Sequence, residues 1–210
     1  MTASAATTTE APLAGAPGMR PVYKVRPLRT DAERAEAAAL VQDRQHWLTQ
    51  RGLAVPTLVD VPAMFRNPQT PSVGLFEDGA LLACMIPRLL TDLCWGTGPC
   101  LFLDHIHTLP DHPDDLARLI TLWASDCAAR HDLPLVRAEM PACGDLLADP
   151  LACLLRRLVD LGWDLRGAGA GRNGDRVARF DLRAEHRSGL SALIGCRVEL
   201  QGASSGQASE

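Results

Sequence analysis

Apolar residues along the chain occur in two patterns, short continuous runs and stripes with a spacing of three and four residues. Short runs bounded by Gly, Pro or Asp are typical of buried strands, whereas the wider spacing is typical of helices that bury one face. The runs predict strands over residues 23–26, 72–76, 80–86, 101–109, 133–140, 164–166 and 176–183. The stripes predict helices over residues 32–50, 61–67, 114–130 and 151–161.

Local signals support these boundaries. Thr30 and Glu33 form a capping-box pattern at the start of the first helix. In Asp60-Val61-Pro62, Asp60 is the expected N-cap of the second helix, with a proline in its first turn. Asp78 and Gly79 separate two apolar runs, which is the pattern of a β-hairpin. The order of elements predicts an α+β fold with a mixed, mostly antiparallel sheet of about seven strands flanked by helices.

Residues 101–130 place a buried strand, a turn at residues 110–113 and an amphipathic helix in succession. A strand that feeds a helix N-terminus through a tight turn is a common phosphate-binding arrangement. In a regular strand, alternate side chains point to opposite faces. That alternation predicts one face with Phe102, Asp104, Ile106 and Thr108, and an opposite face with Leu103, His105 and His107.

The composition, 47% hydrophobic and 22% charged, suits one globular domain with a sizeable core. We place it at residues 21–183, after a disordered leader at residues 1–20 that lacks the pattern of a signal peptide. Residues 184–210 are predicted to be a largely disordered tail whose one apolar patch, LSALIGCRVEL, could pack or pair.

The charge pattern limits the class of partner. A net charge of −4 lacks the clustered cations that nucleic-acid binding needs, so no nucleic-acid partner is expected. No apolar run reaches ~18 residues, which excludes a membrane-spanning helix. Seven cysteines without a C-x-x-C pair indicate reduced thiols in a cytoplasmic protein. A homodimer or a protein partner stays open.

The strand at residues 101–109 carries the candidate chemistry. General-base work on an amine needs a carboxylate or an imidazole with its pKa tuned by burial. Asp104 is the first candidate, and His105 or His107 could replace it; the alternative is a buried side chain that only bonds the backbone. His105 and His107 share a face but lack a third ligand, so no metal is predicted.

These landmarks together resemble the GNAT superfamily of N-acetyltransferases, which have the acyl-CoA N-acyltransferase fold. Thr108-Leu109-Pro110 stands where the family's fourth strand ends in V-x-P, the Asp-Gly turn falls in the usual hairpin, and Gly162-Trp163 matches the stop of the last helix. The family's next turn, (Q/R)-x-x-G-x-(G/A), binds the pyrophosphate of acetyl-CoA. Here its signature positions carry Pro113, Leu116 and Arg118, so the motif is degenerate.

The resemblance implies acetyl-CoA as co-substrate and no metal. Its pantetheine arm would lie along Ile106, His107 and Thr108, and its phosphates near Leu116, Ala117 and Arg118. The expected activity is acetyl transfer to an amine of a small molecule or peptide, with Asp104 or His105 as the base.

Other residues refine this picture. The pattern D-R-x-x-W-L followed by R-G resembles one bacterial subgroup of the family, at Asp43, Arg44, Trp47, Leu48, Arg51 and Gly52. In the family this helix and the segment after it border the acceptor pocket, so Arg44 and Trp47 are predicted to bind substrate. Arg44 could face an acceptor's carboxylate, or it could simply extend from the core edge or pair with Asp43 or another nearby acid. Leu158 stands where the family commonly has a tyrosine general acid.

Two functions therefore stay open. The first is an acetyl-CoA-dependent N-acetyltransferase, and the second is a non-catalytic GNAT-like module that binds another ligand or a protein. The acidic turn, with Asp111, Asp114 and Asp115 at the helix N-terminus, favours the second, because carboxylates there take the place of a phosphate. The intact succession of elements and the acidic residue in the strand favour the first.

Overall fold

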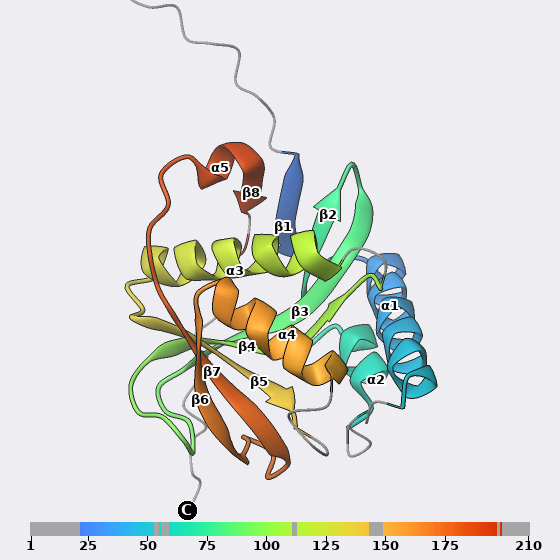
Figure 1. The fold of residues 1–210 in the computed structure, drawn as a ribbon. Coiled ribbons are helices and arrows are strands. Elements are labelled where there is room, and N and C mark those ends of the chain that lie inside the picture. The colour runs from blue at the N-terminus through green and yellow to red at the C-terminus, as the bar shows by residue number, and fades with distance from the viewer. Residues whose placement is uncertain are drawn as a thin grey trace, which may run out of the picture.

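The computed structural model describes residues 22–52, 55, 59–110, 113–142, 149–196 and 198. It contains one eight-stranded sheet in the order β6-β7-β5-β4-β3-β2-β1-β8 (Figure 1). Neighbouring strands are antiparallel except β4 with β5 and β1 with β8. The strands are β1 (Tyr23–Pro27), β2 (Val73–Glu77), β3 (Ala80–Leu90), β4 (Cys100–Thr108), β5 (Leu135–Pro141), β6 (Trp163–Ala170), β7 (Arg176–Arg183) and β8 (Ile194–Cys196). The predicted fold class is confirmed.

The helices lie close to their predicted positions. They are α1 (Asp31–Gln50), α2 (Val61–Arg66), α3 (Pro113–Arg130), α4 (Asp149–Asp160) and the short α5 (Leu190–Leu193). Thr30 accepts a hydrogen bond from the backbone N–H of Glu33, whose carboxylate accepts from the backbone N–H of Thr30. Asp60 caps α2 through the backbone N–H of Ala63. The capping predictions are confirmed.

The helices form two layers on opposite faces of the sheet. Leu119 and Trp123 of α3 and Leu155 of α4 share one apolar cluster with Leu101 and Leu103 of β4. On the other face, α1 and α2 pack on β2 and β3 through a second cluster that includes Val41, Phe65, Phe76 and Ile86. Figure 1 shows α3 and α4 crossing in front of the sheet and α1 with α2 at one end.

The domain extends beyond the predicted boundary at residue 183. Ile194–Cys196 forms β8, which pairs in parallel with Tyr23, Lys24 and Val25 of β1. The indole N–H of Trp123 on α3 donates to the Cys196 thiol, 3.3 Å away, and Ile194 is buried in the larger cluster. Residues 190–196 of the predicted apolar patch therefore pack and pair, because they complete the cluster beneath α3, and residues 184–196 are part of the domain.

A bulge interrupts the pairing of β4 with β3. Asp104 lies opposite Ile86, and His107 lies opposite Cys84, so that two residues of β4 face one residue of β3. His105, the first of the two extra residues, has a φ of 49°, a left-handed conformation that is uncommon for a residue with a Cβ. Strain of this kind is found preferentially at functional sites.

The bulge corrects the predicted faces of this strand. The alternation of a regular strand places Asp104 with Ile106 and Thr108, and His107 on the opposite face. Instead, Asp104 and His107 share the face of Ile86 and Cys84, which α1 and α2 cover. Thr108 lies opposite Ala83 on the α3 face. One extra residue reverses the side-chain parity of all residues that follow it.

Residues 91–99, the loop between β3 and β4, pack on the sheet through Leu93, which lies in a small cluster with Cys100 and Phe102 of β4. The buried guanidinium of Arg137 on β5 donates to the carbonyls of Gly96, Thr97 and Gly98 at 2.9–3.3 Å and pairs with Asp181 of β7 at 3.3 Å. Buried charges require partners of this kind. One arginine thus fixes the path of the loop over β4, β5 and β7.

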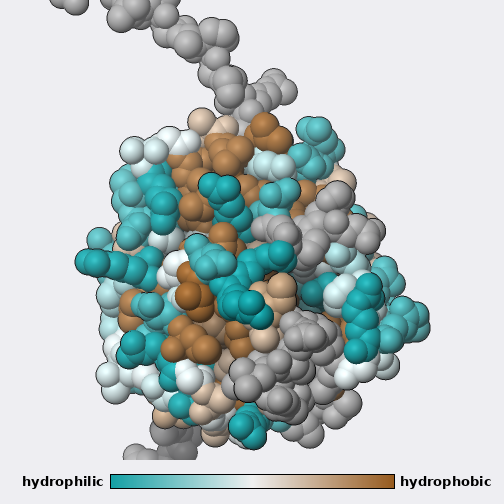
Figure 2. All heavy atoms as spheres, viewed as in Figure 1, coloured by the Kyte–Doolittle hydropathy of each residue, from teal (hydrophilic) through white to brown (hydrophobic). Residues whose placement is uncertain are grey.

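The surface of the described residues is mixed. Figure 2 shows apolar atoms near α5 and α4 among mostly hydrophilic ones. The large hydrophobic residues with more than a third of their surface exposed are Val22, Ile106, Val159, Leu165 and Leu193. No helix among the described residues is long and apolar enough to cross a membrane.

Candidate functional site

Asp104 is the centre of a charged cluster built from three parts of the chain. Its Oδ2 accepts from Nε of Arg88 on β3 at 3.3 Å and from Nη2 of Arg172, between β6 and β7, at 3.5 Å. Its Oδ1 lies 3.4 Å from Nε2 of His105. Both carboxylate oxygens are therefore in contact with cations or an imidazole, and Asp104 ties β3, β4 and the β6–β7 connection together.

The two predicted histidines have different surroundings. Burial lowers the pKa of His105, and Arg88 and Arg172 lower it further, while Asp104 acts in the opposite direction. Burial also lowers the pKa of His107 to about 4, with smaller contributions from His105 and Arg44. Both imidazoles are therefore neutral near pH 7, which leaves each with one ring nitrogen that can accept a proton.

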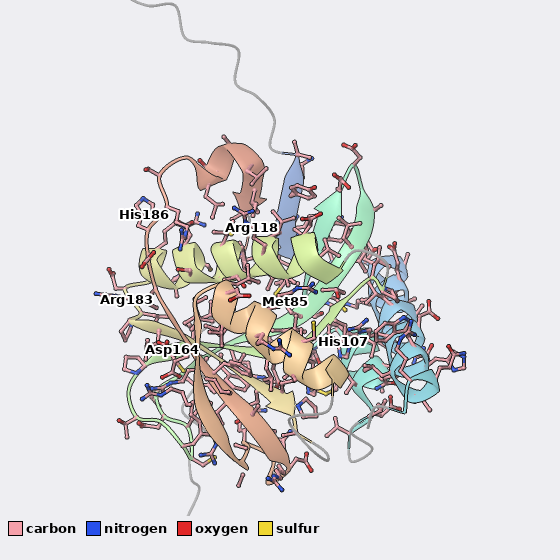
Figure 3. The ribbon with its side chains drawn as sticks, in the orientation of Figure 1. Met85, His107, Arg118, Asp164, Arg183 and His186 are labelled. Carbon is pink, nitrogen blue, oxygen red and sulfur yellow. The ribbon has the colours of Figure 1, made fainter. Side chains whose placement is uncertain are left out.

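His107 belongs to the region between β4 and the α1–α2 layer. Its ring meets Phe65 of α2 edge to face, with ring centroids 6.3 Å apart. Figure 3 shows His107 beside α1 and α2, at the opposite end of the molecule from Arg183 and His186. Phe65 belongs to the apolar cluster on the α1–α2 face, so His107 faces that side of the sheet, as Asp104 does.

A gap in the sheet opens next to the bulge. β4 pairs with β5 only from Cys100 to Leu103, opposite Leu135 to Ala138. Beyond these residues β4 continues to Thr108 and β5 to Pro141 without pairing with each other. Among the described residues, the backbone groups of residues 104–108 on the β5 side thus have no sheet partner. An extended ligand could add to β4 there by main-chain hydrogen bonds.

The predicted phosphate site is only partly described. Residues 111 and 112 of the turn lie outside the described residues. In α3, Leu116 is buried in the core, so its side chain cannot contact a ligand, whereas Asp115 and Arg118 are exposed. The backbone N–H groups of residues 114–116 lack partners within the helix. Figure 3 shows Arg118 on α3, where it is the exposed cation of this predicted set.

The predicted acceptor residues lie on α1, whose middle packs against β3 and β4. Arg44 and Arg51 both stack on the ring of Trp47, with Cζ 4.2 and 3.7 Å from its centroid. Arg44 and Trp47 are half-buried, and Nη1 of Arg44 is buried without a hydrogen-bond partner. Burial lowers the pKa of Arg44, and Arg51 lowers it further. The predicted alternative of an ion pair between Arg44 and an acid is not found among the described residues.

The sequence did not point to four residues of this region, which are Arg88, Trp95, Glu139 and Arg172. Arg88 and Arg172 donate hydrogen bonds to Asp104. Glu139 on β5 accepts from the Trp95 indole at 2.6 Å and from the backbone N–H of Arg172 at 2.9 Å. These residues come from separate elements, and only pairing across the sheet brings them together.

The part of the chain that the structure describes holds no group of three His, Cys, Asp or Glu residues suited to a metal ion. Leu158 of α4 is half-buried against the core, and its side chain has no proton to give. The site thus combines a bulged strand, a strand gap, two neutral imidazoles and the two arginines at the end of α1.

Comparison with known proteins gives structural matches only. No protein-family model and no curated protein sequence matches this chain. A GNAT-family acetyltransferase from Listeria monocytogenes has 17% identity and a TM-score of 0.53, over 76% of this chain and 95% of that one. The ribosomal-protein-S18-alanine N-acetyltransferase from Escherichia coli has 16% identity and a TM-score of 0.52, over 80% and 97%. An N-acetyltransferase from Staphylococcus aureus has 10% identity and a TM-score of 0.53, over 77% and 97%.

These likenesses establish the fold. The chain has the fold of GNAT N-acetyltransferases, and the alignments cover nearly the full length of each of the three solved structures. At these identities the fold alone carries over, and activity has to be argued from the site.

Proposed function

We propose that this protein is an N-acetyltransferase that transfers an acetyl group from acetyl-CoA to an amine of a small molecule or peptide. The observation that carries the proposal is the gap between β4 and β5 directly beside the β4 bulge. The gap offers unpaired backbone along Ile106, His107 and Thr108 to the pantetheine arm. The bulge brings the charged and imidazole groups to the end of that gap.

The reaction needs a proton acceptor for the amine. The amine nitrogen attacks the thioester carbonyl carbon, the carbon–sulfur bond breaks, and the nitrogen loses a proton. We assign the base to His105, because its imidazole is neutral and Asp104 lies 3.4 Å from its Nε2. The negative charge of Asp104, 3.4 Å from Nε2, favours the tautomer with its proton on Nε2, which leaves Nδ1 as the acceptor. Asp104 then positions His105 and does not itself take the proton.

The other roles follow from placement. Arg44 and Trp47 border the acceptor, and the first turn of α3 with Ala117 and Arg118 receives the phosphates, with Leu116 contributing only its backbone. Leu158 cannot protonate the leaving thiolate, so water supplies that proton. We also propose that the protein is cytoplasmic, and a homodimer or a protein partner stays a prediction.

Binding of acetyl-CoA tests the first step. We expect isothermal titration at low salt to detect it, because low salt screens phosphate attraction least. Arg118→Ala should weaken binding, whereas Arg183→Ala, an exposed arginine elsewhere, should not. Absence of binding in the unmodified protein would reject the acetyltransferase.

Turnover tests the base. Acetylated product from a panel of amines should be detected by mass spectrometry, since thiol reagents would also react with the protein's own cysteines. His105→Asn keeps a residue that tolerates a positive φ and removes the imidazole, so turnover should fall roughly 100-fold or more with acetyl-CoA binding retained. Unchanged turnover would remove His105 as the base.

The second candidate is a non-catalytic protein with the same fold. It is favoured by Leu158 in place of a hydroxyl group and by the acidic residue Asp115 at the start of α3. If acetyl-CoA does not bind, the site between β4 and α1 becomes a binding site for another ligand or a protein.

A further inference from the structure

The C-terminal end of α1 carries two cations on one aromatic ring. Arg44, Trp47 and Arg51 are three and four residues apart, so they share one side of the helix. The Trp47 ring holds both guanidinium groups, at 4.2 and 3.7 Å from its centroid. We name these three residues the arginine clamp. Stacking on a rigid ring fixes the plane of a guanidinium and leaves its N–H edges available.

One of these edges lacks a partner. Nη1 of Arg44 is shielded from solvent and donates no hydrogen bond, and no ion pair joins Arg44 or Arg51 to an acid within the described part of the chain. A buried donor without a partner costs free energy, and more when it is charged. An anionic oxygen placed at Nη1 would remove that cost, so the clamp is built to accept an anion.

The clamp lies next to the proposed reaction site. α1 packs against β4, and the charge of Arg44 acts on His107 of that strand. Phe65 meets the ring of His107 edge to face. An anion bound to Arg44 would thus lie near the Trp47 ring, the neutral imidazole of His107 and the charges of Arg44 and Arg51.

These surroundings favour a singly charged, planar anion. Desolvating a dianion beside an aromatic ring and a neutral imidazole costs more than desolvating a carboxylate. A carboxylate also matches the flat, forked edge of a guanidinium. We propose that the arginine clamp binds a carboxylate of the acceptor, so that the substrates are amines that also carry a carboxylate, as amino acids do.

This inference rests on the proposed function for the amine, but the clamp can be tested without catalysis. Nitrogen-15 NMR of the whole chain reports the Trp47 indole N–H, which Trp47→Phe assigns. Propionate is the probe, propionamide is its uncharged counterpart, and chloride keeps the ionic strength constant. We expect propionate to shift the Trp47 resonance saturably and propionamide to leave it unchanged.

Two variants identify the group that binds. Arg44→Gln should weaken propionate binding roughly tenfold or more, as expected for loss of a charged hydrogen bond. Arg66→Gln, an exposed arginine of the neighbouring α2, should bind as the unmodified protein does. If Arg44→Gln fails to fold, Arg51→Gln takes its place and should also weaken binding.

The outcomes separate the inference from the proposed function. No saturable propionate shift, or an equal shift with Arg44→Gln and Arg51→Gln, would overturn the carboxylate site. If inorganic phosphate shifts the Trp47 resonance with a lower dissociation constant than propionate does, the choice of a carboxylate is wrong. If propionate binds but acetyl-CoA does not, the carboxylate site stands and the proposed acetyltransferase activity is rejected.

Discussion

Protonation of His107 is expected to destabilise the protein as the pH falls. Burial lowers the pKa of this imidazole from 6.5 to about 4. An unfolded chain keeps the ordinary pKa, so between these two values the unfolded state binds more protons than the folded state. The free energy of unfolding therefore falls as the pH falls through this range.

The linkage relation gives the size of the effect. The two pKa values correspond to a loss of about 2 kcal/mol of unfolding free energy between about pH 7 and pH 5, and about 3 kcal/mol by about pH 4. His105 adds a loss of the same sign, because burial lowers its pKa as well.

Urea denaturation at about pH 7 and pH 5 measures the loss. Other groups titrate in every variant, so the comparison is between variants of the same chain. His107→Gln should lose about 2 kcal/mol less than the unmodified protein between the two pH values. His131→Gln, which removes an exposed histidine after α3, should behave as the unmodified protein. An equal loss in His107→Gln and the unmodified protein would refute the reasoning.

Three further predictions concern stability and thiol reactivity. Thr30→Ala should lower the free energy of unfolding by about 1 kcal/mol in urea denaturation, because it removes the cap of α1. Arg137→Ala should cost about 3–5 kcal/mol by leaving Asp181 without its buried partner, and a double variant with Asp181→Leu should recover part of that loss. Cys196 should be alkylated faster than Cys94 per exposed thiol at about pH 6.5, because hydrogen bonds from Cys127 and Trp123 lower the pKa of Cys196 to about 5. Peptide mapping measures the ratio.

The elements of the fold were predictable because their signals are local. The capping box at Thr30, the Asp-Gly hairpin and the apolar run of β4 each act within a few residues, and all three appear as predicted. The eighth strand was not predicted as such, since a three-residue strand has too little pattern to separate it from a tail.

The site was predictable only in part. The sequence pointed to Asp104 and His105 by residue type, but strict alternation placed His107 on the wrong face, because a bulge leaves no mark in the pattern of apolar residues. Arg88 and Arg172 were missed since they are separated by 84 positions in the chain and meet only at Asp104.

The pairing of β8 with β1 has a consequence for handling the protein. β1 would otherwise present an outer row of backbone N–H and C=O groups, and such an open edge is a template on which further chains can add. Ile194–Cys196 occupies part of that row. A chain cut at residue 183, the boundary suggested by the sequence, would uncover it together with the apolar side chains beneath. Such a truncated protein should aggregate with increasing concentration, whereas the full chain keeps that edge blocked.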